Sequence, residues 1–223
     1  MTAWTCRKTS KSDAIRKELL FMVDQINATL RRIPTWLVYV LLLLPAPYFL
    51  YLGATGGLGV EPINALERKL GEVALQLIVF GLTVTPLKRW AGLNLQKFRR
   101  AIGIMAFAYA AMHLLVWLVL DVQILSQIFA DLVKRPYITV GLAGFLLLVP
   151  LALTSNNVSV KKLGPKWRVL HRLTYVAAIL GAAHYVMLAK GFQIEPLIYL
   201  GLILGLLALR RVPKSKSRRR AVA

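Results

Sequence analysis

The stretch FRRAIGIMAFAYAAMHLLVWLVL, residues 98–120, decides the fold of this chain. Its segment 101–120 contains no Asp, Glu, Lys or Arg, and about 20 apolar residues are what a helix needs to cross the hydrocarbon core of a bilayer. His113 stands in the outer part of the stretch, and Arg99 and Arg100 stand at its start. The stretch therefore predicts a transmembrane helix with a basic entrance and one ionisable side chain at depth.

Five further stretches have a similar length and composition: residues 36–53, 71–87, 137–154, 168–189 and 194–209. Backbone that crosses lipid must form a helix or a closed barrel, because its polar groups find no water there. Barrel strands would alternate apolar and polar residues, and these stretches do not alternate. The predicted fold class is an all-α integral membrane protein, a bundle of six transmembrane helices.

The composition argues against nucleic acid as the reason for the strong positive charge. The chain has 223 residues, of which 57% are hydrophobic, and a formal net charge of +20. A soluble domain this basic would suggest nucleic acid as its partner. Here the long apolar stretches argue against that partner, and the single cysteine, Cys6, excludes a disulfide scaffold.

The charge separates by topology. If the six stretches span the membrane, 24 of the 29 Lys and Arg and three of the nine acids fall on the side of the two termini, so this side has a net charge of +21 and the other −1. Cytoplasmic loops carry the excess of Lys and Arg in membrane proteins. Both termini are therefore predicted to be cytoplasmic, with membrane lipids as partners of the basic side.

The chain divides into one membrane domain and two basic appendages: 1–35, 36–210 and 211–223. Within the first, residues 13–33 place apolar side chains at helical spacing, and Pro34 ends the pattern. An interfacial amphipathic helix and a solvated tail both fit this segment. A second amphipathic segment, 122–135, is expected on the outer surface.

Three histidines are the candidates for chemistry, because ionisable side chains within membrane spans are rare and usually functional. They are His113, His171 and His184, and all lie in apolar stretches. A single buried histidine is more often structural, but three of three favour ligation, and histidine is a common axial ligand of haem iron. By depth, His113 and His184 fall in the outer half of the membrane on parallel helices, where they can face each other across one porphyrin.

The role of His171 stays open at this point. It lies 13 residues before His184, about 20 Å along a helix, so it cannot share that haem. It is a candidate ligand of a second, inner haem, but an ideal helix would not place both histidines on one stripe. Helix 168–189 is therefore irregular, for instance near Gly181, or the two rings face different neighbours. Arg99, Arg100 and Arg172 are candidate partners for haem propionates, and Arg99 and Arg100 equally for phospholipid headgroups.

Several short motifs occur together in a specific order. They are GGLGVEP (56–62), LTVTPL (82–87), FRRAIG (98–103), VKRPYITVG (133–141), LALTS (151–155), LGPKWRVLHRLTY (163–175) and EPLIYLGL (195–202). With His113 and His184, they make residues 36–210 resemble the MsrQ (YedZ) family, within the wider group of ferric-reductase-like transmembrane domains.

The resemblance implies a haem b subunit of the bacterial inner membrane. It implies His113 and His184 as haem ligands and His171 as a further ligand, so one haem or two. It also implies electron transfer to a periplasmic molybdopterin methionine sulfoxide reductase (MsrP), from the quinone pool or a cytoplasmic flavin reductase, with FMN as a further cofactor. Relatives can carry a histidine where this chain has Arg68, and no motif here marks an FMN or quinone site.

Two other functions fit part of the pattern. A self-contained ferric or oxygen reductase would need a flavin and nicotinamide domain, which the basic tail 211–223 is too short to hold. A transporter or membrane scaffold would use the three histidines structurally. The sequence favours a non-catalytic electron-transfer subunit over both.

Overall fold

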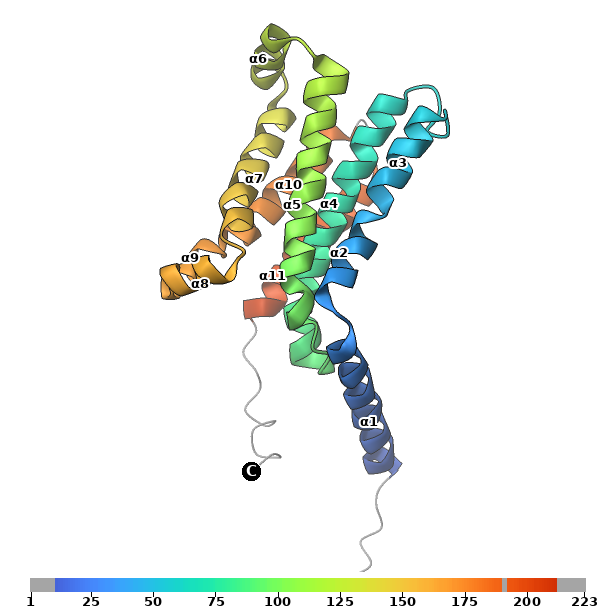
Figure 1. Ribbon diagram of the computed structural model, residues 1–223, viewed down its shortest axis with the longest axis vertical. Coiled ribbons are helices and arrows are strands. Elements are labelled where there is room, and N and C mark those ends of the chain that lie inside the picture. The colour runs from blue at the N-terminus through green and yellow to red at the C-terminus, as the bar shows by residue number, and fades with distance from the viewer. Residues whose placement is uncertain (1–10, 190–191, 212–223) are drawn as a thin grey trace, which may run out of the picture.

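A computed structural model describes residues 11–189 and 192–211, and every element in them is helical. In chain order the helices are α1 (Lys11–Arg32), α2 (Thr35–Leu43), α3 (Pro45–Ala54), α4 (Pro62–Pro86), η1 (Leu87–Ala91), η2 (Gln96–Phe98), α5 (Arg99–Val116), η3 (Trp117–Val122), α6 (Leu125–Lys134), α7 (Pro136–Leu153), α8 (Asn157–Leu163), α9 (Pro165–Leu170), α10 (Leu173–Leu188) and α11 (Ile194–Arg211). The elongated bundle confirms the all-α class, while α1 extends from its lower end (Figure 1).

Four continuous helical stretches in the described residues are long and apolar enough to cross a bilayer: Thr35–Ala54, Pro62–Ala91, Gln96–Val122 and Pro136–Leu153. Their length and apolar composition indicate an integral membrane protein. Two further helices, α10 and α11, lie beside them; α10 has 16 residues, and α11 begins near Glu195 and ends on Arg210 and Arg211.

Two helix pairs form the centre of the bundle. Helix α4 packs along α5, and α7 packs along α10, while α11 covers α10 and α4. A buried cluster between α4 and α5 includes Leu70, Ile102 and Tyr109, and a second cluster joins α4, α10 and α11 through Leu82, Ala178 and Ile203. These contacts leave the inward faces of α5 and α10 opposite each other.

Two predicted helix bounds are wrong. The second helix begins at Pro62 rather than at residue 71, because proline is suited to the first helical turn and the charged turns that follow continue the helix despite their low hydropathy. The stretch 168–189 is not one helix: α9 ends at Leu170, and a turn at His171 and Arg172 precedes α10. An irregular helix is one of the two alternatives predicted for this stretch, with Gly181 as an example of its place, and the irregularity lies at His171 itself.

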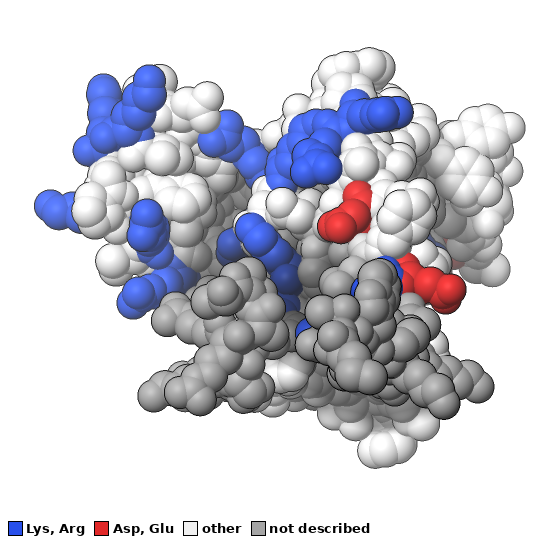
Figure 2. Space-filling model, turned by 90° about the horizontal axis from the view of Figure 1, so that it is seen from below, with Lys and Arg blue, Asp and Glu red and all other residues white. Residues whose placement is uncertain are grey.

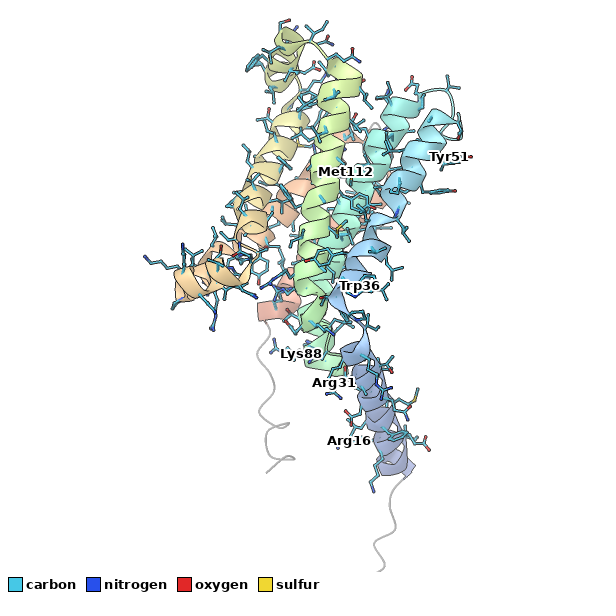
Figure 3. The ribbon with its side chains drawn as sticks, in the orientation of Figure 1. Arg16, Arg31, Trp36, Tyr51, Lys88 and Met112 are labelled. Atoms are coloured by element: carbon cyan, nitrogen blue, oxygen red, sulfur yellow. The ribbon has the colours of Figure 1, made fainter. Side chains whose placement is uncertain are left out.

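The charges gather at one end of the bundle, which we call the basic end. It is formed by η1, η2, α8, α9 and the last turn of α11, and Figure 2 shows Lys and Arg side chains dominating the visible charges of this face. Arg16, Arg31 and Lys88 lie toward this end, whereas Tyr51 lies near the opposite end (Figure 3). Helix α6 and the turn 55–61 lie at the opposite end.

Helix α1 is attached to the basic end by polar contacts. The Asn27 side chain donates to the Gly92 carbonyl at 3.0 Å and accepts from the Asn94 backbone at 2.8 Å. The Lys97 ammonium donates to the Arg31 and Ile33 carbonyls at 2.9 and 2.6 Å. These bonds fix α1 to the loop between η1 and α5.

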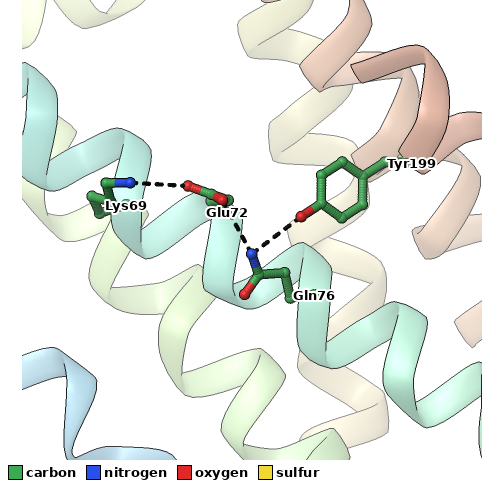
Figure 4. Close-up of polar contacts among 4 residues, drawn as sticks. All are labelled: Lys69, Glu72, Gln76 and Tyr199. Atoms are coloured by element: carbon green, nitrogen blue, oxygen red, sulfur yellow. Dashed lines mark hydrogen bonds and ion pairs between the residues drawn. The ribbon is translucent and has the colours of Figure 1, made fainter. Parts of the chain in front are cut away.

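A polar chain links α4 to α11 nearer the opposite end. The Lys69 ammonium lies 3.5 Å from the Glu72 carboxylate, and the Gln76 amide donates to Glu72 at 3.1 Å and to the Tyr199 hydroxyl at 3.1 Å (Figure 4). Hydrogen bonds of this kind join helices in lipid, where a polar side chain otherwise lacks a partner. They help to hold α11 in the bundle.

Candidate functional site

His113 is held against α4 by a single backbone carbonyl. Its ring projects from α5, and its Nδ1 lies 2.8 Å from the Glu67 carbonyl oxygen, one turn into α4. Gly71 lies four residues further along α4, and a Cβ built there would meet His113 Nδ1 at 3.0 Å. The ring can approach the α4 backbone this closely because Gly71 has no side chain.

His184 is held in the same way by α7. Its Nδ1 lies 2.7 Å from the Tyr137 carbonyl oxygen, near the start of α7, and its ring projects from α10. A Cβ at Gly141, again four residues beyond the carbonyl, would meet His184 Nδ1 at 2.7 Å. Carbonyl and histidine are 46 residues apart in the first case and 47 in the second.

The two helix pairs therefore build one arrangement twice, and sequence reasoning missed it. Gly141 ends the VKRPYITVG motif, but neither it nor Gly71 is among the predicted site residues. The signal was present: in both pairs a glycine precedes the histidine by a nearly constant distance, 42 residues in one and 43 in the other. The missing Cβ at each position is what admits an imidazole to the backbone.

The two rings come together between the helix pairs. The His113 and His184 ring centroids are 6.2 Å apart, with an angle of 75° between the ring planes. A carbonyl oxygen only accepts, so each neutral ring carries its proton on Nδ1 and keeps the lone pair on Nε2. No residue in the described ranges hydrogen-bonds either Nε2.

This geometry fits two axial ligands of one metal ion. Two metal–nitrogen bonds of about 2 Å, with the reach of each ring added, place the ring centroids about 6 Å apart. In residues 11–189 and 192–211 there is no group of three or more His, Cys, Asp or Glu side chains that could hold a metal ion alone. Two facing imidazoles suit a metal whose other ligands come from a planar ring, as in haem.

His171 lies apart from this pair, at the basic end. Its Nε2 is 3.1 Å from the Thr154 hydroxyl oxygen, and its ring stacks on Trp167 with centroids 3.9 Å apart. The Trp167 indole donates to the Thr154 carbonyl at 2.9 Å. His171 thus sits in a small polar and aromatic cluster that joins α7, α9 and the turn before α10.

The three arginines singled out in the sequence also lie at the basic end. Arg100 donates to the Asn157 side chain at 2.8 Å, Arg99 lines a pocket with Tyr175 and Arg210, and Arg172 is exposed in the turn after α9. Arg99 precedes His113 by 14 residues, which is about 20 Å along α5. The structure does not bring these arginines to the His113–His184 pair.

Comparison with known proteins gives two results. The family model "Ferric reductase like transmembrane component" matches residues 70–182, which include Gly71, His113 and His171, while His184 lies just beyond. A curated relative from Brucella anthropi, "Protein-methionine-sulfoxide reductase heme-binding subunit MsrQ", is 45% identical over 82% of this chain and 84% of its own length. A relative of the same name from Brucella ovis is 46% identical over 78% of this chain and 80% of its own. The chain therefore belongs to the MsrQ family and carries its ferric-reductase-like transmembrane component.

Proposed function

We propose that this protein is the haem b electron-transfer subunit of a membrane-bound methionine sulfoxide reductase system. The observation that carries the proposal is the facing pair His113 and His184, each with Nδ1 bonded to a backbone carbonyl and Nε2 directed away from it. The relatives are named as haem-binding subunits of such a reductase, which supports both the cofactor and the system.

The chain's own contribution is orientation. Haem, when bound, supplies a centre that takes up and releases one electron at a time. The Glu67 and Tyr137 carbonyls fix the tautomer and direction of the two rings and raise the basicity of their Nε2 atoms. Both carbonyls belong to rigid helices, so the two nitrogens are held in place before the cofactor binds.

The proposal includes the direction of electron flow. The chain spans the inner membrane six times, with α10 and α11 as the fifth and sixth spans and both termini in the cytoplasm. The charge imbalance between the two ends supports this orientation. His113 and His184 bond carbonyls near the starts of α4 and α7, close to the opposite, periplasmic end. The acceptor is a periplasmic MsrP-like molybdopterin reductase, which repairs oxidised proteins there.

The electron donors act from the membrane or from the cytoplasmic side. Electrons come from the quinone pool or from a cytoplasmic flavin reductase, and FMN is a further cofactor by family resemblance. His171 is the ligand of a second haem in the two-haem form of this proposal, with Arg99, Arg100 and Arg172 near its propionates. In the one-haem form, His171 keeps the structural contacts to Thr154 and Trp167.

Electron transfer to the partner tests the function. The purified full-length protein is placed in liposomes, its haem is reduced, and the periplasmic reductase and a methionine sulfoxide substrate are added. We expect the haem to be reoxidised only when both additions are present, and His184→Ala to abolish the signal. Reduced haem that is stable to both additions would overturn the assignment of the acceptor.

A further inference from the structure

A pocket of about 300 Å³ opens at the basic end, where three helix ends meet. The end of α4 with η1, the start of α5 and the last turn of α11 surround it, and Tyr175 of α10 completes the wall. Its lining residues are Thr85, Pro86, Arg89, Trp90, Arg99, Tyr175, Leu209 and Arg210. Arg99 is about 20 Å from His113 along α5, so the pocket is distinct from the histidine pair.

Arg210 is fixed in this pocket by neutral groups alone. Its Nη1 donates to the Tyr175 hydroxyl at 2.7 Å, its Nη2 donates to the Leu82 carbonyl at 2.8 Å, and its guanidinium carbon lies 5.1 Å from the Tyr175 ring centre. The Arg210 Nε is buried, and no described residue accepts from it. Removing the Arg210 guanidinium from water in this way is energetically unfavourable unless an anion lies nearby to pair with it.

Two more arginines add to the charge instead of reducing it. Arg99 contacts Tyr175 and lies close enough to Arg210 for the two cations to repel each other, and Arg89 faces the same pocket. Within the described ranges the ion pairs are Lys69–Glu72 and Arg135–Asp131, and neither includes a pocket residue. Three guanidinium groups thus share one cavity without an ion pair to a carboxylate in the part of the chain that is described.

We propose that this pocket binds the phosphate group of an amphiphilic ligand. Guanidinium groups match phosphate oxygens with paired, charge-assisted hydrogen bonds. Trp90, Pro86 and Leu209 provide an apolar wall beside the arginines, which suits a ligand with a non-polar body. The pocket lies at the ends of membrane helices, the level of the phosphate layer, on the side that the proposed orientation makes cytoplasmic and rich in anionic lipid.

Two kinds of ligand could supply the phosphate group. One is the headgroup of an anionic phospholipid that enters sideways from the membrane. The other is a soluble phosphate ester such as FMN, whose ring would lie against Trp90. The phosphate contact is common to both and does not depend on haem ligation by His113 and His184. It rests on the one-haem form of the proposed function, because a second haem would bring its propionates to Arg99.

Binding to full-length, haem-loaded protein tests the site. Native mass spectrometry counts phosphatidylglycerol retained from nanodiscs of mixed phosphatidylcholine and phosphatidylglycerol, and equilibrium dialysis measures FMN with inorganic phosphate as competitor. The variants are Arg99→Gln and Arg89→Gln, whose side chains make no hydrogen bond to the α11 backbone. Arg168→Gln, an exposed arginine on α9 at the same end but outside the pocket, is the matched control.

We expect binding of one of the two probes to weaken by a factor of about ten to a hundred in Arg99→Gln, the usual effect of losing a hydrogen bond between charged groups. Arg168→Gln should bind as the unsubstituted protein does. If Arg99→Gln loses only phosphatidylglycerol binding, the ligand is a phospholipid. If it loses only FMN binding, the ligand is a soluble phosphate ester. The proposal is overturned if neither probe binds, if Arg99→Gln and Arg168→Gln weaken binding equally, or if Arg99→Gln loses haem, because haem carboxylates would then occupy the arginines.

Discussion

At the scale of single residues, Gly71 and Gly141 set how closely each histidine ring approaches the neighbouring helix. The carbonyls that orient the rings belong to Glu67 and Tyr137, and each glycine is one turn further along the same helix. A methyl group at either glycine would push the ring away from its carbonyl. The glycines therefore set the positions of the two imidazole rings.

Gly141→Ala should lower the haem content of the purified protein, and Gly71→Ala should lower it less. The added Cβ would lie 2.7 Å from His184 Nδ1 in the first variant and 3.0 Å from His113 Nδ1 in the second. Loss of a ligand's outer hydrogen bond typically weakens metal affinity about 10- to 100-fold. Haem per protein, from the pyridine haemochrome absorbance, measures the effect.

Gly103→Ala is the matched control on α5. A Cβ at Gly103 meets nothing within 4 Å, so this variant should keep its full haem content. If all three substitutions reduce haem equally, the effect is a general one on helix packing and the proposed role of the two glycines is wrong.

At the scale of elements, Tyr109 of α5 stabilises the break between α2 and α3 through a hydrogen bond. Pro45 has no backbone N–H, and α2 ends just before it. The hydroxyl of the buried Tyr109 donates to the Leu42 carbonyl at 2.9 Å. One side chain of α5 thus supplies a hydrogen bond to a backbone carbonyl next to the break.

Tyr109→Phe should lower the stability of the bundle by about 1–3 kcal/mol, because the Leu42 carbonyl loses its hydrogen-bond donor. Thermal unfolding in detergent, followed by circular dichroism, measures the change. Tyr48→Phe, at an exposed side chain on α3, should leave the unfolding temperature nearly unchanged. Equal unfolding temperatures for both variants would show that the Tyr109 bond contributes nothing.

At the scale of the whole molecule, the charge imbalance between the two ends predicts the orientation in the membrane. With both termini predicted in the cytoplasm, green fluorescent protein fused after residue 223 should fluoresce, and alkaline phosphatase fused there should be inactive. A fusion within the turn 55–61 should give the reverse pattern. An active phosphatase at the C-terminus would contradict the predicted cytoplasmic location of that end. If the fusion at 55–61 also gave an inactive phosphatase, the bundle would be inverted and the His113–His184 pair would lie toward the cytoplasm.

The sequence predicts the helical class well because hydropathy is a strong, additive signal along each stretch. The helical class follows from stretches such as 101–120, and the proximity of His113 and His184 follows from depth along parallel helices. The turn at His171 could not be predicted, since an apolar stretch gives no sign of a break that tertiary contacts to Thr154 and Trp167 stabilise. The Arg89–Arg99–Arg210 pocket was missed because its members come from three distant segments.

Haem content of the full-length protein and its histidine variants tests the central claim most directly. We expect a reduced-minus-oxidised spectrum with b-type bands, and a haem-to-protein ratio that falls by one in both His113→Ala and His184→Ala. His171→Ala in the same assay separates one haem from two: the ratio stays at one, or falls from two to one. A protein without b-type bands, or His113→Ala and His184→Ala variants that keep the full ratio, would contradict the account.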